Sequence, residues 1–352
     1  MSRYQLPLQP PPIKGFLRWA YTLSITHNYA ETLPWYYTNF IQISCTKHFL
    51  EKRQQFFFDF FRGKPNELNF NNPFLLTCAV NYELLSGFRP DELVEFMVGR
   101  IRQGYYAIVF IDESKITIGP AYGGDAFPHH LMLSGYDLKE QTFDVSMFDG
   151  HLVYRTLKIP FEDFISACES MKRLIESGLT ADHHTFFYRF NGEHPFAFDP
   201  VAVADQLRDY LNSETHLNRI NYNPDGEVFG LATYEYLQMY FRAAAEQYPS
   251  LVSPNGVRHL HLLWEHKKVM ADRIRYFAQH GIIEQDEELL RSFEELANKA
   301  KLLRDQLAIA ETKGDERIFA KMPAKLEAFK EREPALLERL LKHVESGQPV
   351  GT

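Results

Sequence analysis

Residues 104–164 decide the fold of this chain. They begin GYYAIVFIDES (104–114), pass through a connection rich in Gly and Pro, and continue FPHHLMLSGYDLKEQTFDVSMFDGHLVYRTLKIPFEDF (127–164). The first run is almost wholly apolar, as a central strand should be. Two further strand-like runs flank the polar turn at 138–141, and LVYRTLKI follows as another strand before a helix that begins in IPFEDF. The pattern predicts an antiparallel sheet with a helix after it.

Helices are predicted ahead of this sheet. Pro34 suits the first turn of a helix, and helical spacing relates Phe40, Ile41, Ser44, Cys45 and His48. A second helix is predicted over 74–85 and a third over 91–101. Residues 1–15 contain three consecutive prolines and are predicted to form an extended arm.

Beyond Pro195 the pattern becomes helical throughout. Helices are predicted at five places, over 199–211, 230–247, 257–280, 286–312 and 324–344. Helices, then strands, then helices favour the α+β class over an alternating α/β fold. We therefore predict an α+β domain over 1–195 and an all-helical domain over 196–352.

Composition excludes several classes of protein. A net charge of −8 and a pI near 6.0 argue against a nucleic-acid-binding protein, which needs a basic face. Three cysteines without CxxC spacing favour free thiols in a reducing cytoplasm over a disulfide framework or a zinc site. The N-terminus lacks the apolar core of a signal peptide, and no apolar run approaches the ~18 residues of a membrane span. We predict a cytoplasmic protein without metal, membrane or nucleic acid.

Histidine and aspartate stand at the ends of predicted strands. His129 and His130 open the second run, and Asp149 closes the third. Cysteine hydrolases use such a pair, because an imidazole takes the proton of the nucleophile and a carboxylate fixes the imidazole tautomer. Adjacent residues of a strand face opposite sides, so only one histidine can enter a given cleft. The alternatives are structural histidines and a turn aspartate ahead of Gly150.

The nucleophile is less clear than the base. Cys45 and Cys78 lie on the first and second predicted helices, and neither occupies a first turn, where the helix dipole would lower the pKa of a thiol. Thr38 and Asn39 lie nearer the helix start than either thiol. Packing of a buried cysteine is the alternative for both, and Cys168 is predicted to be core.

Two further polar groups have competing interpretations. Asp112 and Glu113 end the first strand, where they either orient a substrate amine or form a turn. His261, Glu265 and His266 lie on one predicted helix, without the HExxH spacing of a zinc hydrolase. A buried packing contact and a polar patch closing over a cleft are both compatible with this second group.

The chain resembles a known family in several of these segments. LPWYYTNFIQISC, GYYAIVFIDES, HHLMLSGYD, and FDVSMFD followed by IPFEDF are similar to the N-terminal domain of butirosin biosynthesis protein H and its relatives. The resemblance covers residues 33–165 and continues in YEYLQMYF and LHLLWEHKKVMADRIRYF, so that it spans most of the chain. These relatives are papain-like proteins related to bacteriocin-processing cysteine peptidases, and many occur beside nonribosomal-peptide synthetase genes.

The resemblance implies a papain-like domain over 1–195 that performs Cys–His–Asp acyl transfer. An acyl group would pass from the phosphopantetheine arm of an acyl or peptidyl carrier protein, by way of the thiol, to a small-molecule amine or to water, in an antibiotic or related natural-product pathway. By position, Cys45 would be the nucleophile, His129 the base and Asp149 the orienting acid, with no cofactor bound to the chain itself. The cysteine of the family should open the first long helix, and this sequence departs from the pattern there. We assign six further residues to substrate binding: Tyr37, Thr38, Asn39, Asp112, Glu113 and His130.

Two other functions remain open at this point. One is a catalytically inactive papain-like scaffold that binds a carrier domain or a peptide. The other is a cysteine peptidase that uses the same residues on a leader peptide.

Overall fold

The protein belongs to the α+β class, as predicted. The computed structural model describes residues 2–61, 68, 72–181, 183–216, 225–246 and 255–347. Helices make up about 52% of it and strands about 18%, and the C-terminal region is helical. The chain divides into two compact units. The sheet unit comprises Met1–Thr32 and Asn66–Pro195, and the helical unit comprises Leu33–Pro65 and Phe196–Thr352.

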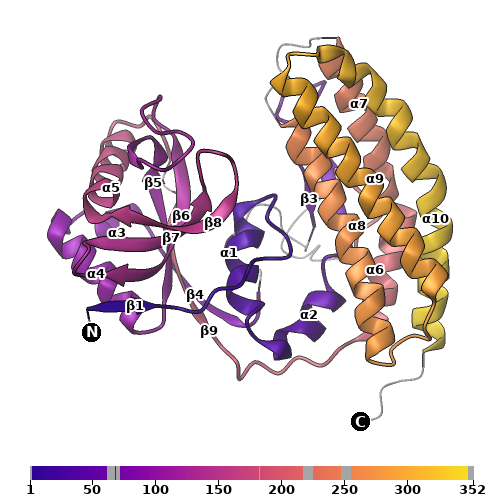
Figure 1. Ribbon diagram of the computed structural model, residues 1–352, viewed down its shortest axis with the longest axis horizontal. Helices are drawn as coiled ribbons and strands as arrows, with labels where there is room; N and C mark the ends of the chain where they lie inside the picture. Colours follow the sequence, from indigo (N-terminus) through magenta and orange to yellow (C-terminus); the bar gives the residue numbers. More distant parts are fainter. Residues whose placement is uncertain are drawn as a thin grey trace. The chain divides into compact units, whose positions relative to one another are not determined.

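A seven-stranded sheet forms the centre of the sheet unit. Its strand order is β4-β9-β5-β6-β7-β8, β1 pairs with β6, and every pairing is antiparallel (Figure 1). The strands are β1 (Arg3–Gln5), β4 (Leu75–Val80), β5 (Tyr106–Asp112), β6 (Pro128–Asp137), β7 (Thr142–Phe148), β8 (Tyr154–Pro160) and β9 (Thr185–Phe190). The predicted strands of residues 104–164 are therefore confirmed as β5 to β8.

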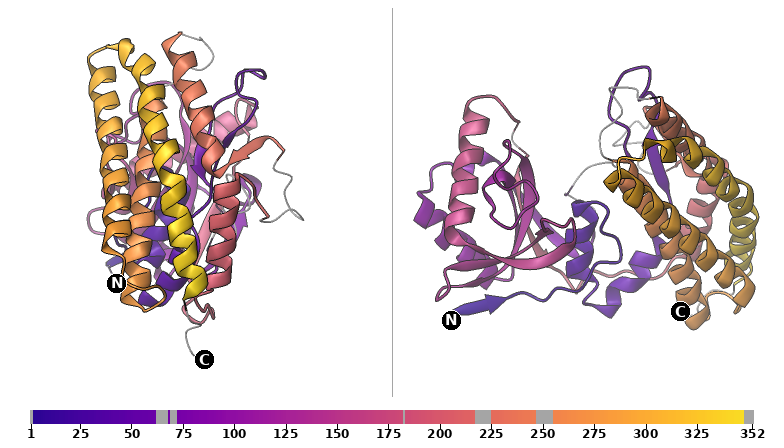
Figure 2. Two further views of the ribbon diagram at one scale, coloured as in Figure 1. Left: turned by 90° about the vertical axis from the view of Figure 1, so that its right-hand side faces the viewer. Right: turned by 45° about the horizontal axis from the view of Figure 1, so that its top comes forward.

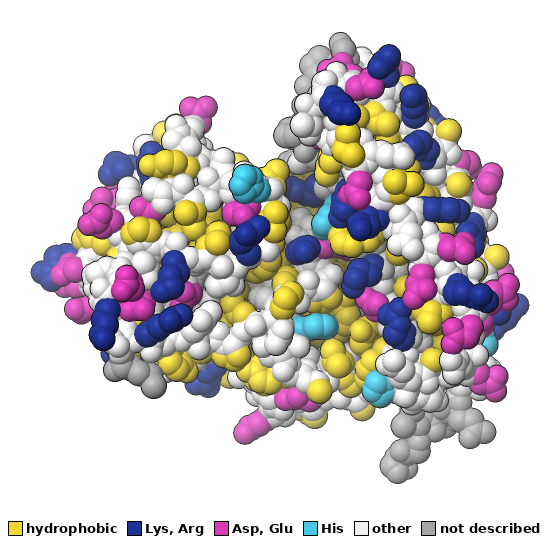
Figure 3. Space-filling model, viewed as in Figure 1, with side chains coloured by type: hydrophobic (Ala, Val, Ile, Leu, Met, Phe, Trp, Pro, Cys, Tyr) yellow, Lys and Arg dark blue, Asp and Glu magenta, His cyan; other side chains and the backbone are white. Residues whose placement is uncertain are grey.

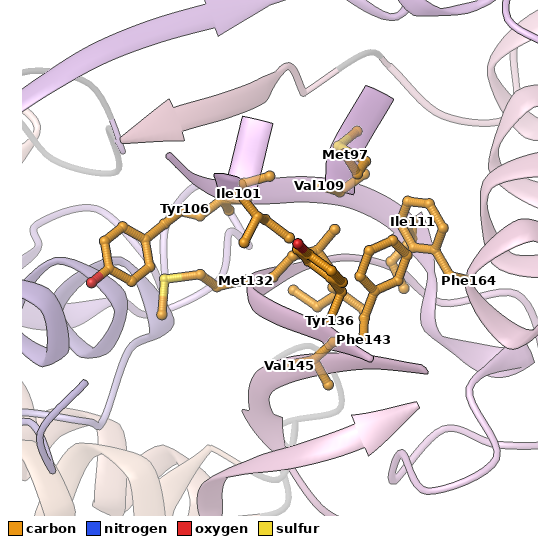
Figure 4. Packing of buried hydrophobic residues seen from close by; sticks show 14 of the residues in the cluster. Met97, Ile101, Tyr106, Val109, Ile111, Met132, Tyr136, Phe143, Val145 and Phe164 are labelled. Atoms are coloured by element: carbon orange, nitrogen blue, oxygen red, sulfur yellow. The ribbon is translucent and has the colours of Figure 1, made fainter. Parts of the chain in front are cut away.

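Helices cover both faces of this sheet. α4 (Pro90–Arg102) and α5 (Phe161–Glu176) lie on one side together with the short α3 (Tyr82–Leu85), and α1 (Leu17–Thr26) lies on the other (Figures 1 and 2). Pro90 occupies the first turn of α4, and Glu92 accepts a hydrogen bond from the Arg89 N–H, which closes a capping box. Figure 4 shows the core between sheet and helices, with Met97 and Ile101 of α4 and Phe164 of α5 close to Val109, Ile111 and Phe143 of the strands.

The helical unit consists mainly of helices, and all but the first of them are long. They are α2 (Leu33–Thr38), α6 (Pro200–Asn212), α7 (Thr233–Ala245), α8 (Gly256–Gln279), α9 (Glu287–Thr312) and α10 (Met322–Ser346). A small antiparallel sheet, in the order β10-β2-β3, completes the unit and consists of β2 (Ile43–Thr46), β3 (Phe58–Phe60) and β10 (Glu227–Phe229). The five helices predicted beyond Pro195 are confirmed as α6 to α10.

Charged side chains of both signs are interspersed on the outer face of the helical unit (Figure 3). Arg339, for example, pairs with Asp286 at 2.7 Å and with Glu288 at 2.9 Å. The interior contains ions as well, because Lys267 and Glu333 pair with no exposed side-chain surface. The buried ammonium has a further polar partner, since Lys267 also donates to the Tyr210 hydroxyl at 3.2 Å.

Two predicted helices are wrong. Residues 40–48 contain the strand β2 in place of a helix, because Phe40, two residues after the end of α2, adopts a positive φ of 58° that a helix does not allow. Residues 74–85 form β4 and then α3. All six residues of β4 pair with β9, so the hydrogen bonds of the sheet edge override the helical spacing.

The first helix of the sheet unit was not predicted, and it is α1 at Leu17–Thr26. Residues 33–65, which we placed in the first domain, lie in the helical unit. In the part of the chain that the structure describes, no helix has the length and apolarity needed to cross a bilayer.

Candidate functional site

A histidine and a buried glutamate are in contact in the sheet unit. The Nδ1 atom of His129 lies 2.7 Å from Oε2 of Glu113. The Glu113 side chain is 6% exposed and the His129 side chain 38%. A carboxylate bonded at Nδ1 holds the N–H on that atom, which leaves the lone pair of Nε2 as the basic position. The half-exposed ring can therefore accept a proton from a bound group.

The hairpin between β5 and β6 brings these two residues together. Asp112 ends β5 opposite Pro128, and the Glu113 N–H donates to the Phe127 carbonyl at 2.9 Å. The ladder thus continues one step beyond the strand and places Glu113 beside His129. The Glu113 side chain is also confined, because a Cβ on Gly119 would lie 3.3 Å from its Cγ and Oε1 atoms.

Asp112 fixes the turn that carries Glu113. Its carboxylate accepts hydrogen bonds from the N–H groups of Ser114 and Phe127 and from the Ser170 hydroxyl at 2.6 Å. Burial by itself would raise the pKa of this carboxyl, but those donors outweigh burial and lower the pKa below its usual value. Asp112 is fully buried, so the structure contradicts its assignment to substrate binding and gives it a structural role.

His130 is held by backbone. Its Nε2 atom lies 2.8 Å from the His183 carbonyl and 3.1 Å from the His184 carbonyl. Phe110 and Phe186 lie beside the ring. Burial lowers the pKa of His130 to about 4, so the ring is neutral at pH 7. The ring joins β6 to the segment before β9, which is the structural interpretation of this histidine.

Asp149 is a turn residue and not the partner of His129. Its Oδ1 atom accepts hydrogen bonds from the N–H groups of His151 and Val153, and its Oδ2 atom pairs with Arg155 at 2.9 Å. These interactions, led by the Val153 N–H, lower the pKa of the carboxyl. The sequence predicts that Asp149 orientates His129, whereas the carboxylate that contacts this ring in the structure is Glu113.

Cys45 is a core residue of the helical unit. It lies on β2, paired with Phe58 of β3 and Val228 of β10, and is 2% exposed. Burial raises the pKa of its thiol well above the usual value. A neutral, enclosed thiol on a strand lacks the features of a nucleophile, so the packing interpretation holds for Cys45.

Tyr37, Thr38 and Asn39 form the C-terminal end of α2. The buried Arg273 donates from Nε to the Tyr37 carbonyl at 2.9 Å and also donates to the Asn39 carbonyl. The Thr38 carbonyl accepts from Gln206 at 2.9 Å. Carbonyls at a helix end need such donors, so Arg273 and Gln206 cap the C-terminal end of α2. The three predicted residues therefore end a helix of the helical unit and do not open the helix of a catalytic site.

The remaining cysteines do not supply the missing nucleophile. Cys78 is exposed on β4, and Cys168 is half-buried on α5, where burial raises the pKa of its thiol. The first turn of α1 follows Phe16 and holds no cysteine. Within the described ranges, no group of three His, Cys, Asp or Glu side chains is placed to hold a metal ion.

The third polar group is a packing contact. His261 lies 3.0 Å from Glu265, one turn away on α8, and Glu265 is 1% exposed. His266 is fully buried and lies 2.8 Å from the Ile41 carbonyl. These contacts agree with the interpretation of the group as a buried packing contact.

Comparison with known proteins gives no assignment. No family model matches the sequence. No curated protein matches it either.

Proposed function

We propose that the sheet unit catalyses acyl transfer with His129 as general base and Glu113 as the group that orients it. The observation that carries this proposal is the 2.7 Å contact between a buried carboxylate and a half-exposed imidazole. A general base needs a fixed tautomer and an accessible lone pair, and this pair supplies both. The proposal keeps the acyl chemistry expected from the resemblance and removes Cys45 and Asp149 from it.

The reaction is direct and needs no acyl-enzyme. An amine attacks the carbonyl carbon of a thioester while Nε2 of His129 takes a proton from the attacking nitrogen. The C–N bond forms, the C–S bond breaks, and the imidazolium returns the proton to the departing thiolate. Water in place of the amine gives hydrolysis. Glu113 stabilises the imidazolium that exists between the two proton transfers.

The donor and the setting follow from the resemblance. We propose as donor an acyl group on the phosphopantetheine arm of a carrier protein, and as acceptor a small amine, in a cytoplasmic natural-product pathway. A papain-like arrangement agrees with α1 on one face of an antiparallel sheet and a histidine near the start of a strand. The difference from the family would lie in the first turn of α1, which begins after Phe16 and holds no cysteine.

A second candidate is a scaffold that binds a carrier domain without turnover. The burial of Cys45 favours it, because a papain-like domain that has lost its thiol nucleophile loses the usual reaction. The His129–Glu113 pair would then only support the hairpin. The two candidates predict different behaviour of the same variants.

The test is aminolysis and hydrolysis of acyl-pantetheine and acyl-carrier thioesters, followed by mass spectrometry. His129→Ala should lower kcat/KM by about 10²- to 10⁴-fold. Glu113→Gln should lower it by about 10²-fold, since an amide at that position can favour the wrong tautomer. Cys45→Ala and Asp149→Asn should keep the wild-type rate.

Two results would reject the direct mechanism. An acyl adduct on Cys45, with loss of turnover in Cys45→Ala, would restore the acyl-enzyme. Binding of the carrier with unchanged affinity in His129→Ala, and no turnover by the wild type, would favour the scaffold.

A further inference from the structure

The sheet unit contains an apolar pocket that the proposed reaction does not use. The pocket has a volume of about 140 Å³ and lies among α3, α4, α5 and β5. Leu85, Phe88, Met97, Val109 and Ile175 are among the side chains that line it. A cavity of roughly 150 Å³ lined by Leu, Ile and Phe binds benzene, so this pocket has room for one aromatic ring or a branched aliphatic side chain.

Two charges of opposite sign stand at the rim of the pocket. Glu169 and Lys172 both line it, and they lie three residues apart on one face of α5. The Lys172 Nζ atom donates to the Ser86 carbonyl at 3.2 Å, which uses one of its three N–H groups. In the described part of the chain, Glu169 has no ion-pair or hydrogen-bond partner, and it does not pair with Lys172.

We propose that this pocket binds an apolar α-amino acid, with its side chain in the cavity and its zwitterion on the rim. The carboxylate would pair with Lys172 and the ammonium with Glu169. A zwitterion matches two opposite charges that leave each other unpaired, whereas a plain carboxylic acid or amine leaves one of them unmatched. The pocket includes neither His129 nor Glu113, so this inference does not depend on the proposed function.

The probe is L-phenylalanine, tested with the full chain by calorimetry. Phenylalaninamide and 3-phenylpropionate serve as ligands that lack the carboxylate and the ammonium respectively. The wild type should bind L-phenylalanine about tenfold more tightly than either, the size expected for a partly exposed charge-assisted hydrogen bond. Lys172→Met should remove the preference over the amide, and Glu169→Gln the preference over the propionate.

Matched controls separate ligand contacts from effects on folding. Arg173→Met lies on the same helix, outside the pocket, and should bind as the wild type does. Ile175→Phe should fill the cavity and abolish binding, whereas Leu179→Phe, on an exposed turn, should not. Bound L-phenylalanine should also slow alkylation of Cys168, which lines the pocket.

The proposal is overturned by either of two results. One is absence of any L-phenylalanine binding by the wild type up to about 10 mM. The other is equal affinity for all three ligands, which would mean that the rim charges do not select the zwitterion.

Discussion

A buried histidine of the helical unit, His259, should make that unit less stable in acid. His259 lies on α8 and is 2% exposed, and neither ring nitrogen has a hydrogen-bond partner among the residues that the structure describes. Its ring contacts Phe56 and Tyr240, with centroids 5.0 and 4.8 Å away. Burial lowers the pKa of His259 to about 3, from an ordinary value of 6.5. The folded protein therefore keeps this ring neutral where the unfolded chain protonates it.

The sign and size of the effect follow from that difference. Between pH 6.5 and about 3, His259 binds a proton in the unfolded chain and not in the folded protein. Its contribution to the free energy of unfolding therefore falls as the pH falls. Each pKa unit corresponds to about 1.4 kcal/mol, which gives a loss of about 2 kcal/mol between pH 7 and pH 5. His259→Leu should remove that loss. At pH 7 the variant should match or exceed the wild type, by up to about 2 kcal/mol, because an unsatisfied buried group is removed.

Urea denaturation at several pH values measures this slope. Trp19 lies in the sheet unit, so a Trp19→Phe background leaves Trp35 and Trp264 to report on the helical unit. His280→Leu, at the exposed end of the same helix, is the control and should keep the wild-type slope. Parallel stability curves for wild type and His259→Leu between pH 7 and pH 5 would refute the reasoning.

Three further predictions concern stability and are tested by urea denaturation, the first two in the Trp19→Phe background and the third with Trp19 present to report on the sheet unit. Lys267→Met should cost about 3–5 kcal/mol by leaving Glu333 charged and buried, and a second change, Glu333→Leu, should recover most of it. Gly230→Ala should cost more than about 1 kcal/mol, since φ is +53° and a Cβ would lie 2.1 Å from a carbonyl oxygen, whereas Gly226→Ala meets no atom within 4 Å. Asp112→Asn should cost about 1–3 kcal/mol through its buried hydrogen bonds.

The strongly patterned parts of the fold could be predicted from the sequence. β5 is apolar up to its last residue, and α9 has a continuous apolar stripe, so the local pattern is enough to predict each of them. β2 and β4 could not be identified in this way, because both are short and owe their conformation to distant partners. β2 pairs with β10, about 180 residues later in the chain, and such a pairing leaves no local signal.

The same reason explains why residues 33–65 were placed in the wrong part of the molecule. They follow α1 directly in the chain, and nothing in their composition indicates a change of unit. Their interactions are nevertheless with the C-terminal helices, as when Arg273 donates to the Tyr37 carbonyl or Gln206 to the Thr38 carbonyl. Contacts across more than 160 residues of sequence can be read only from coordinates.

The carboxylate that orients His129 could have been found from the sequence. His129 lies opposite Ile111, and Glu113 follows Ile111 by two residues and so points to the same face, which makes Glu113 and His129 diagonal neighbours in the hairpin. Asp149 follows the last residue of β7, the strand that pairs with β6 on the side away from β5. The register pairs Met132 with Ser146, and continuing it by three residues on each strand would place Asp149 opposite His129. Register therefore allowed either carboxylate, and the turn from Asp149 to Val153 decided between them by using the Asp149 oxygens itself.

The two carboxylates should consequently respond differently to the same loss of charge. Glu113→Gln removes the only carboxylate bonded to His129 in the described structure, so the ¹⁵N chemical shifts of the His129 ring should report a change of tautomer. Asp149→Asn should leave those shifts unchanged and weaken the hairpin between β7 and β8, which faster amide exchange at His151 and Val153 would detect. If the His129 ring instead responds to Asp149→Asn and ignores Glu113→Gln, the pairing of base and acid in the sheet unit is wrong, and with it the direct mechanism.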